Sequence, residues 1–200
     1  YDTFTGFKFL AEKKDKLEGA GEGKVVFSYE ESYGYMLGDF VRDKDAVTAS
    51  LALTEMAAYY ASKGMTVLDA LNALYEKHGY YGEKTHNLVM PGLDGLKDMA
   101  KLMASLRQTP PREIAGVTVR QFKDYQDGSV VDCATGKASA MELSGSNVLR
   151  FELADGTSII VRPSGTEPKI KVYVLTKGKD AAERDANLAK YASWVAELKP

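Results

Sequence analysis

The sequence predicts an α/β domain, incomplete, with helices around a mixed sheet, followed by an α+β domain whose four-stranded, mainly antiparallel sheet is covered by a helix. Three observations lead to this fold class. Helical periodicity alternates with short extended stretches over residues 6–108. Strand-like runs then dominate residues 114–175, before one last helical stripe. Pro110-Pro111 stands between them; because it cannot continue a helix and stiffens the chain, we expect domains at 1–108 and 109–200.

The first domain should begin with a helix and a strand. Apolar residues at helical spacing predict a helix from Gly6 to Gly19, and the glycines that follow end it. Val25 to Phe27 are apolar and predict a strand. Asp43 is a typical helix N-cap, so the next helix should run to about Ser62. Its inward positions are expected to include Val47, Leu51, Ala58 and Ala61.

Two more helices and an extended stretch complete this domain. Thr66 and Asp69 have the spacing of a capping box, and the helix that they start should end at Gly79. Residues 80–90 are polar and aromatic and are expected to be extended. Pro91-Gly92 then introduces a helix that stops before the two prolines. Its apolar face is expected to comprise Leu96, Met99, Ala100 and Met103.

Four β-rich runs predict the strands of the second domain. They cover residues 114–122, 147–153, 157–161 and 170–175. Ala154-Asp155-Gly156 is typical of a hairpin turn between the second and third runs. Asp180 and Glu183 then predict a capped helix start. The stripe that should cover one face of the sheet comprises Leu188, Tyr191, Ala192, Val195 and Leu198.

Composition narrows the function classes. Hydrophobic residues make up 44% of the chain, which is enough for ordinary globular cores. A net charge of −2, with scattered Lys and Arg, argues against a nucleic-acid surface. No apolar run approaches the ~20 residues of a membrane helix. A single cysteine, Cys133, excludes an intramolecular disulfide, so we expect a cytoplasmic protein. The chain starts at Tyr1 without an initiator Met, and we expect it to be a piece of a longer protein.

Residues 162–169 combine a cation, two hydroxyls and a glycine turn between two predicted strands. Arg162 offers a planar fork of donors that can bind phosphate with two hydrogen bonds. Ser164 and Thr166 add hydroxyl donors, and Gly165 lets backbone N–H groups approach the oxygens closely. We call residues 162–169 the cradle. A plain turn has the same composition, so both interpretations stay open from these residues alone.

A second polar cluster, Glu30-Glu31-Ser32, follows the predicted strand near residue 27. The end of a strand in an α/β sheet is where ligands commonly bind. A carboxylate can accept from two neighbouring sugar hydroxyls, and a serine can donate or accept. A solvated acidic loop is the alternative interpretation.

The string from Arg162 to Val174, R-P-S-G-T-E-P-K-I-K-V-Y-V, resembles the signature of the C-terminal domain of the α-D-phosphohexomutases, the family of phosphoglucomutases and phosphomannomutases. In that family the loop holds the sugar phosphate that is not being transferred. The resemblance therefore implies that the cradle residues bind this phosphate. It also implies that Lys171, in the following strand, helps to neutralise it, with Lys169 as a weaker candidate.

Three segments near the start resemble the third domain of the same family. Glu30 and Ser32 match positions that hold sugar hydroxyls, although Tyr29 and Tyr33 stand where the family often has glycine. The string Y-E-E-S-Y-G-Y is similar to a bacterial phosphoglucomutase branch related to animal phosphopentomutase. Arg42-Asp43-Lys44-Asp45 resembles the family's R-x-K-D segment, in which the lysine reaches the substrate phosphate or sugar, so Lys44 matches that lysine.

The segments around Lys44 and Thr5 also lie in the expected first domain. Helix capping by Asp43 beside a surface lysine is another interpretation of the residues around Lys44, and both can hold together. Thr5-Gly6-Phe7-Lys8 resembles the segment T-G-[WF]-K, which places Thr5 near the ligand, at a helix N-terminus that favours anions in any case.

The resemblance implies an isomerase that interconverts hexose 1-phosphate and hexose 6-phosphate, with a phosphoserine, Mg²⁺ and glucose 1,6-bisphosphate as activator and intermediate. The family's serine-phosphorylation and aspartate metal loops do not occur in this sequence; Asp43-Lys44-Asp45 supplies only two carboxylates. His78 and His86 stand in no recognisable catalytic or metal-ligand spacing. We therefore expect a substrate-binding portion without catalytic or metal-binding residues, inactive alone, whose partners are a sugar phosphate and the missing N-terminal domains.

Other functions stay open on the sequence. A phosphopentomutase of the same family would bind a smaller sugar ring, which Glu30, Ser32 and Tyr33 would sense. A non-catalytic phosphosugar-binding module would need no phosphoserine elsewhere in its chain. A nucleic-acid module is the third alternative, which the acidic balance disfavours.

Overall fold

The computed structural model describes residues 1–92, 94–165 and 167–198, and the chain divides into two compact units, Tyr1–Leu74 and Tyr75–Pro200. This division falls earlier than the expected boundary between residues 108 and 109. The strand β3 (Tyr80–Val89) pairs along its whole length with β10 (Lys169–Gly178) of the second unit. Residues expected at the end of the first domain thus belong to the second, because long-range strand pairing outweighs the local Pro110-Pro111 signal.

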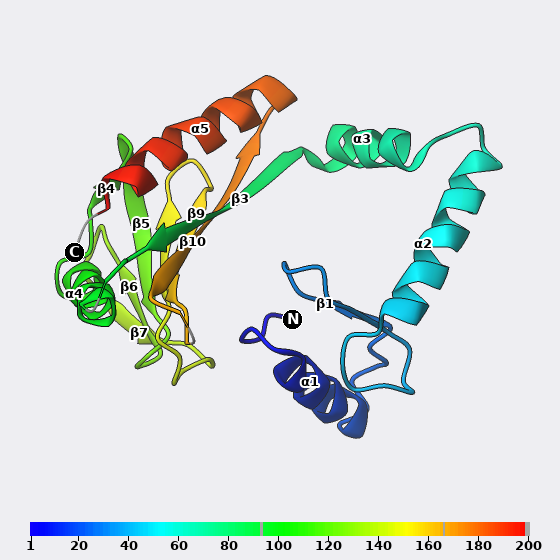
Figure 1. The fold of residues 1–200 in the computed structure, drawn as a ribbon, viewed down its shortest axis with the longest axis horizontal. Coiled ribbons are helices and arrows are strands. Elements are labelled where there is room, and N and C mark those ends of the chain that lie inside the picture. Colours follow the sequence, from blue (N-terminus) through cyan, green and yellow to red (C-terminus); the bar gives the residue numbers. More distant parts are fainter. Residues whose placement is uncertain (93, 166, 199–200) are drawn as a thin grey trace. The chain divides into compact units, whose positions relative to one another are not determined.

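The first unit contains a helix, a two-stranded sheet and a second helix (Figure 1). Helix α1 (Phe7–Gly19) matches the predicted helix and buries one stripe, Phe7, Ala11, Lys14 and Leu17. Strands β1 (Phe27–Tyr29) and β2 (Tyr35–Leu37) form an antiparallel hairpin, and β1 starts later than expected. Helix α2 (Ala46–Ala61) follows, and α3 (Val67–His78) crosses the division between the units.

Helix α2 differs from its prediction in two respects. Its N-cap is Asp45, whose carboxylate accepts a hydrogen bond from the N–H of Val47, and not Asp43. None of its residues is buried: Val47 is 78% exposed and Leu51 is 60% exposed. The periodicity correctly predicted a helix, but the expected inward positions have no layer over them in the part of this unit that the structure describes.

Helix α3 begins and ends as predicted. Thr66 Oγ1 accepts from the N–H of Asp69 at 3.1 Å, and Asp69 Oδ2 accepts from the N–H of Thr66 at 2.8 Å. This reciprocal pair is a capping box. Gly79, with a φ of 104°, ends the helix in a conformation that favours glycine.

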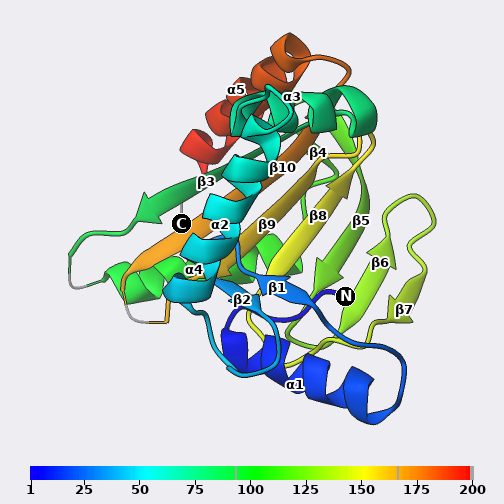
Figure 2. The same cartoon turned by 90° about the vertical axis from the view of Figure 1, so that its right-hand side faces the viewer.

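The second unit is built on one antiparallel sheet, whose strands lie side by side in Figure 2. Over the described residues it has eight strands in the order β3-β10-β9-β8-β5-β6-β7, with β4 paired to β5. The expectation of four strands was too low, because β4, β6 and β7 are short and because β3 joins the sheet. The remaining strands are β4 (Glu113–Ile114), β5 (Val117–Asp124), β6 (Ser129–Asp132), β7 (Ala138–Ala140), β8 (Leu149–Leu153) and β9 (Ser158–Pro163).

Two helices contribute to the hydrophobic core of this sheet. Helix α4 (Gly95–Gln108) buries Leu102, Met103 and Leu106. Of its expected apolar face, Met103 is buried and Met99 packs against the core, whereas Leu96 and Ala100 are exposed. Helix α5 (Ala181–Glu197) buries Tyr191 and Val195, as the stripe predicted. The Asp180 carboxylate accepts from the N–H of Glu183 at 2.8 Å, which confirms the cap.

Strand β10 shows how the sheet separates its two faces. Ile170, Val172 and Val174 are fully buried in the core. Lys171 and Tyr173 alternate with them and are partly exposed on the opposite face. The fold class is confirmed, since helices are combined with antiparallel sheets in this chain. Lys171, the predicted site residue in the strand after the cradle, lies on the polar face.

Candidate functional site

The cradle connects β9 to β10, as the sequence predicted. Arg162 in β9 and Lys171 in β10 are direct partners in the antiparallel register. Ser164 is tied into the connection: its N–H donates to the carbonyl of Lys169 at 2.9 Å, and its hydroxyl accepts from the N–H of Glu167 at 3.3 Å. Gly165 lies in the same connection, and no side chain would meet a Cβ placed on it. Thr166 lies outside the described residues.

Arg162 and Lys171 present two like charges on one face of the sheet. Residues directly opposite in an antiparallel pair have their Cβ atoms about 5 Å apart, and like charges there are destabilising. Among the described residues, neither side chain is in an ion pair, whereas the nearby Lys169 ammonium lies 2.5 Å from Glu167 Oε2. An anion between the two cations would remove this repulsion.

Two other cations on the neighbouring strands are already neutralised. Arg150 Nε lies 2.7 Å from Glu152 Oε1, and Lys123 Nζ lies 3.1 Å from the same oxygen. Burial raises the pKa of Glu152, but the hydrogen bond from Ser158 and the charges of Arg150 and Lys123 together hold this pKa below its ordinary value. Glu152 is therefore charged and neutralises Arg150 and Lys123. In the described part of the chain, no carboxylate forms an ion pair with Arg162 or Lys171 in the same way.

In the first unit, α1 and β1 bring Thr5 and Glu30 together. Glu30 follows β1, and its N–H donates to the carbonyl of Gly34 at 2.9 Å, which closes a turn. Its Oε1 accepts from the N–H of Gly6 at 2.5 Å, next to Thr5. Thr5, Glu30 and Glu31 line a hollow of about 480 Å³. The hollow thus contains two of the residues predicted to lie near a sugar.

Ser32 and Lys44 lie outside that hollow. The Ser32 hydroxyl donates to Glu31 Oε1 at 3.0 Å on the exposed turn. The Lys44 ammonium lies 3.1 Å from Asp43 Oδ1 and 5.5 Å from the centroid of the Phe7 ring. The backbone N–H and the side chain of Lys44 lower the pKa of Asp43. Asp43 thus binds Lys44 and does not cap α2, so the capping interpretation is wrong.

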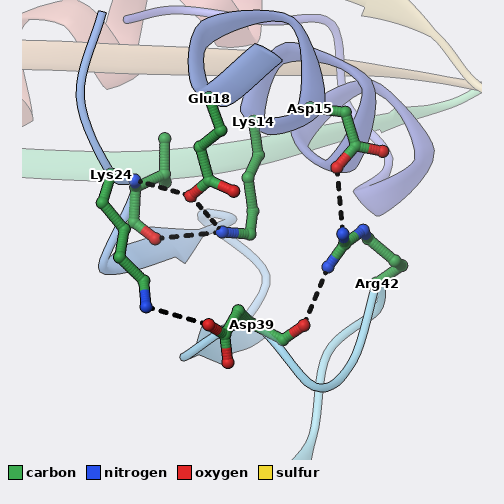
Figure 3. A network of polar contacts seen from close by, with 7 residues as sticks. Lys14, Asp15, Glu18, Lys24, Asp39 and Arg42 are labelled. Atoms are coloured by element: carbon green, nitrogen blue, oxygen red, sulfur yellow. Dashed lines mark hydrogen bonds and ion pairs between the residues drawn. The ribbon is translucent and has the colours of Figure 1, made fainter. Parts of the chain in front are cut away.

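A polar network ties α1 to the segment that precedes Lys44 (Figure 3). Arg42 Nη2 lies 3.1 Å from Asp15 Oδ1, and Arg42 Nη1 donates to the carbonyl of Asp39 at 3.0 Å. Lys24 Nζ lies 2.8 Å from Asp39 Oδ2. The buried Lys14 pairs with Glu18, whose Oε1 also accepts from the N–H of Val25 at 3.0 Å.

Arg42 is part of the R-x-K-D segment, and the sequence did not predict these contacts of its side chain. The lysine within the apolar stripe of α1, Lys14, was the signal for them. Since buried charges are normally paired, a lysine at an inward helical position indicates a carboxylate close by.

A further hollow, of about 830 Å³, lies in the second unit and contains none of the predicted site residues. Its lining includes Lys177, at the opposite end of β10 from the cradle, with Tyr81, Arg184 and Asp185. Arg184 Nε lies 2.8 Å from Asp185 Oδ1. Arg184 thus has a carboxylate partner within the lining of this hollow.

The described residues contain no group of three or more His, Cys, Asp or Glu side chains placed to hold a metal ion. None of the helices in the described ranges is both long and apolar enough to cross a membrane. In the same ranges, His86 Nε2 is buried without a hydrogen-bond partner. Burial, together with the charge of Lys84, lowers the pKa of His86.

Two family models match this chain. "Phosphoglucomutase/phosphomannomutase, alpha/beta/alpha domain III" covers residues 1–78, and "Phosphoglucomutase/phosphomannomutase, C-terminal domain" covers residues 87–188. The gap between the two matches includes the start of β3, so the matched ranges follow the two compact units more closely than the Pro110-Pro111 boundary.

Curated relatives are similar over most of the chain. The phosphoglucomutase of Staphylococcus aureus strain N315 is 37% identical over 179 residues, which is 90% of this chain and 32% of the relative. That of strain RF122 is 37% identical over 88% of the chain and 31% of the relative. The chain spans about a third of the length of the curated relatives that it matches.

A solved structure shows the same fold. The phosphoprotein pp63/parafusin of Paramecium, described as a phosphoglucomutase in an open form, aligns with a TM-score of 0.56 at 20% identity. The alignment covers 98% of this chain and 34% of that protein.

Proposed function

The chain belongs to the phosphoglucomutase/phosphomannomutase family, and on that premise we propose that it is the substrate-binding C-terminal portion of an isomerase that interconverts hexose 1-phosphate and hexose 6-phosphate. The observation that carries the proposal is the pair Arg162 and Lys171. Two cations lie directly opposite each other on one sheet face, and neither is in an ion pair in the described part of the chain.

The cradle would hold the sugar phosphate that does not react. A phosphate between Arg162 and Lys171 would accept charge-assisted hydrogen bonds, and the Arg162 fork can engage two of its oxygens at once. Ser164 and Gly165 would complete the site with a hydroxyl and with backbone groups that a ligand can approach closely. Thr166 and Lys169 remain in the proposal as further donors. The result would be a fixed position for one end of the substrate.

The first unit would bind the sugar hydroxyls through hydrogen bonds. One oxygen of Glu30 accepts from Gly6, which orients the carboxylate, and the other oxygen is left to accept from a sugar hydroxyl. Ser32 lies on the same turn and can donate or accept. Lys44 would add a cation for the substrate, and Thr5 a hydroxyl beside Glu30.

The reaction itself would take place on residues outside this chain. We propose that the full-length protein carries the phosphoserine and uses Mg²⁺ and glucose 1,6-bisphosphate, as the family resemblance implies. The described residues of this chain do not fit the metal, because they contain no cluster of metal ligands. This chain alone would bind and orient the sugar phosphate without turnover. We further propose that the protein acts in the cytoplasm.

The activity is tested with the full-length protein, assayed for conversion of glucose 1-phosphate to glucose 6-phosphate, with ribose 1-phosphate as the competing substrate. Turnover of glucose 1-phosphate with the higher kcat/KM supports the proposal. A preference for ribose 1-phosphate would show a phosphopentomutase, and binding without turnover of either would show a phosphosugar-binding module.

The division of roles is tested by substitution in the same protein. Arg162→Ala should weaken glucose 1-phosphate binding by roughly 1.5–3 kcal/mol in calorimetry, the scale of a hydrogen bond to a charged group. Lys169→Ala is the control, because Glu167 already pairs with that lysine, and it should have the smaller effect. Glu30→Gln should change the preference between sugars more than the affinity for phosphate. Equal behaviour of the Arg162 and Glu30 variants would contradict the division.

A further inference from the structure

Tyr33 has a backbone conformation that its side chain disfavours. Its φ is 64°, in the left-handed region where a Cβ crowds the following carbonyl. Among the described residues, the other non-glycine residue at positive φ is Ala115, in the second unit. A bulky aromatic residue is costly at such a position, and strain of this kind persists where the surrounding structure imposes it.

The turn around Tyr33 explains why the strain falls on this residue. The N–H of Glu30 donates to the carbonyl of Gly34 at 2.9 Å, which fixes a tight turn from Glu30 to Gly34. Gly34 has a packing role, since a Cβ there would lie 2.6 Å from Phe7 Cε2. The glycine is therefore required for contact with α1, and the left-handed position falls on Tyr33.

The ring of Tyr33 contributes nothing visible to the packing of this unit. It is 87% exposed, and no ring contact or hydrogen bond of its side chain occurs within the described residues. The aromatic residues of the adjacent hairpin behave differently. Phe27 stacks on Tyr29 with ring centroids 5.5 Å apart and on Tyr35 at 6.1 Å. The strained turn thus exposes the aromatic ring of Tyr33, one residue after Ser32, to solvent.

We propose that Tyr33 is a specificity-determining residue whose ring covers the apolar C–H face of the bound sugar. The inference rests on the proposed function, because it takes the Glu30 turn as the place where the sugar lies. The face of an aromatic ring is negative, and the C–H groups on one side of a pyranose are slightly positive and apolar, so the two surfaces attract. Glu30 and Ser32 would bind the hydroxyls at the sugar's edge while Tyr33 binds its face. A pentose ring offers less of this face.

Variants of the full-length enzyme test the proposal, with KM for glucose 1-phosphate and the midpoint of thermal unfolding as readouts. Tyr33→Gly should raise KM by roughly threefold to tenfold, the scale of one aromatic contact. It should not lower the unfolding midpoint, because it relieves the backbone strain. Tyr33→Phe keeps the ring and should keep a KM close to that of the wild type. Ala115→Gly relieves the same kind of strain in the second unit and should leave KM unchanged.

Discrimination between sugars gives a second readout. Tyr33→Gly should narrow the difference in kcat/KM between glucose 1-phosphate and ribose 1-phosphate, and Tyr33→Phe should preserve it. An unchanged KM in Tyr33→Gly together with a lower unfolding midpoint would overturn the proposal, because the ring would then pack against the rest of the protein. Equal losses in the Phe and Gly variants would also overturn it, by assigning the effect to the hydroxyl.

Failure of this inference is distinguishable from failure of the proposed function. A wild-type enzyme that converts glucose 1-phosphate, combined with a Tyr33→Gly variant of unchanged KM and midpoint, would remove the role of Tyr33 and leave the proposed function intact. A wild-type enzyme that neither binds nor converts any sugar phosphate would remove both.

Discussion

In the second unit, strand residues such as Ile159, Val161 and Val172 are fully buried beneath helices, whereas in the first unit the apolar residues Val47 and Leu51 of α2 are more than half exposed. The second unit buries its apolar side chains within its own sheet and helices. The first unit relies on the contact of α1 with a small hairpin and on the charge network around Lys14. Apolar side chains contribute to stability in proportion to the area that they remove from water, so those of α2 should contribute less than those of the second unit's strands.

The largest expected effect tests this contrast directly. Ile159→Ala should lower the free energy of unfolding of the second unit by about 2–5 kcal/mol, because it removes buried methyl groups and leaves a cavity. Leu51→Ala, on the exposed side of α2, should change stability by less than about 0.5 kcal/mol. Urea unfolding followed by circular dichroism measures both. Similar losses in the two variants would show that α2 is covered after all, for example by a second copy of the chain.

The charge network gives the second contrast, within the first unit. Lys14→Ala should destabilise this unit by about 1–3 kcal/mol, because it removes a fully buried side chain and its contact with the Val25 carbonyl at 3.4 Å. Lys24→Ala removes an exposed side chain and should have a much smaller effect. Amide hydrogen exchange of α1 measures the difference. Equal protection in the two variants would mean that the buried lysine does not hold α1 to the hairpin.

Helix caps should act alike in both units, because a cap satisfies local backbone groups whatever covers the helix. Asp45→Ala and Asp180→Ala should each cost about 1 kcal/mol. Asp43→Ala is the control for Asp45, since Asp43 does not cap α2, and it should leave the stability of that helix unchanged. Helix content measured by circular dichroism during thermal unfolding checks this. If the Asp43 variant were as destabilised as the Asp45 variant, Asp43 would be the N-cap, as the sequence predicted.

Local signals in the sequence were sufficient for much of the fold. The capping box at Thr66 and Asp69 and the cap at Asp180 depend only on residues three apart, and both occur as predicted. The pairing of β3 with β10 joins segments about ninety residues apart, and nothing within residues 80–90 indicates that partner. The exposure of α2 could not be predicted either, because periodicity shows which face of a helix is apolar but not what covers that face.

The candidate site shows the same limit. A hairpin between β9 and β10 follows from the cradle sequence, so the opposition of Arg162 and Lys171 was within reach of a register argument. The left-handed conformation of Tyr33 was not, because it depends on the contact of Gly34 with Phe7, a residue in another element. The roles of these residues in binding remain predictions for the experiments above.

The smallest expected effect concerns His86, which brings a titratable group to the edge strand of the second unit's core. Burial and the charge of Lys84 lower its pKa below the ordinary value of 6.5, and its Nε2 has no hydrogen-bond partner among the described residues. As the pH falls through 6.5, the unfolded chain therefore takes up this proton before the folded chain does. Stability should fall on the acid side of that value, by less than about 1 kcal/mol for a partly exposed group.

The His86→Leu variant should lose this acid-side decrease, because it cannot be protonated and because leucine suits the apolar neighbour Val172 across the strand pair. Urea unfolding at pH 7.5 and pH 5.5, followed by the fluorescence of Trp194 in the same unit, measures the difference between wild type and variant. A wild-type protein with the same pH dependence as the variant would show that the imidazole is solvated in the folded state. The hydrophobic core of the second unit would then not include β3, and the two units would differ less in how far their apolar residues are buried.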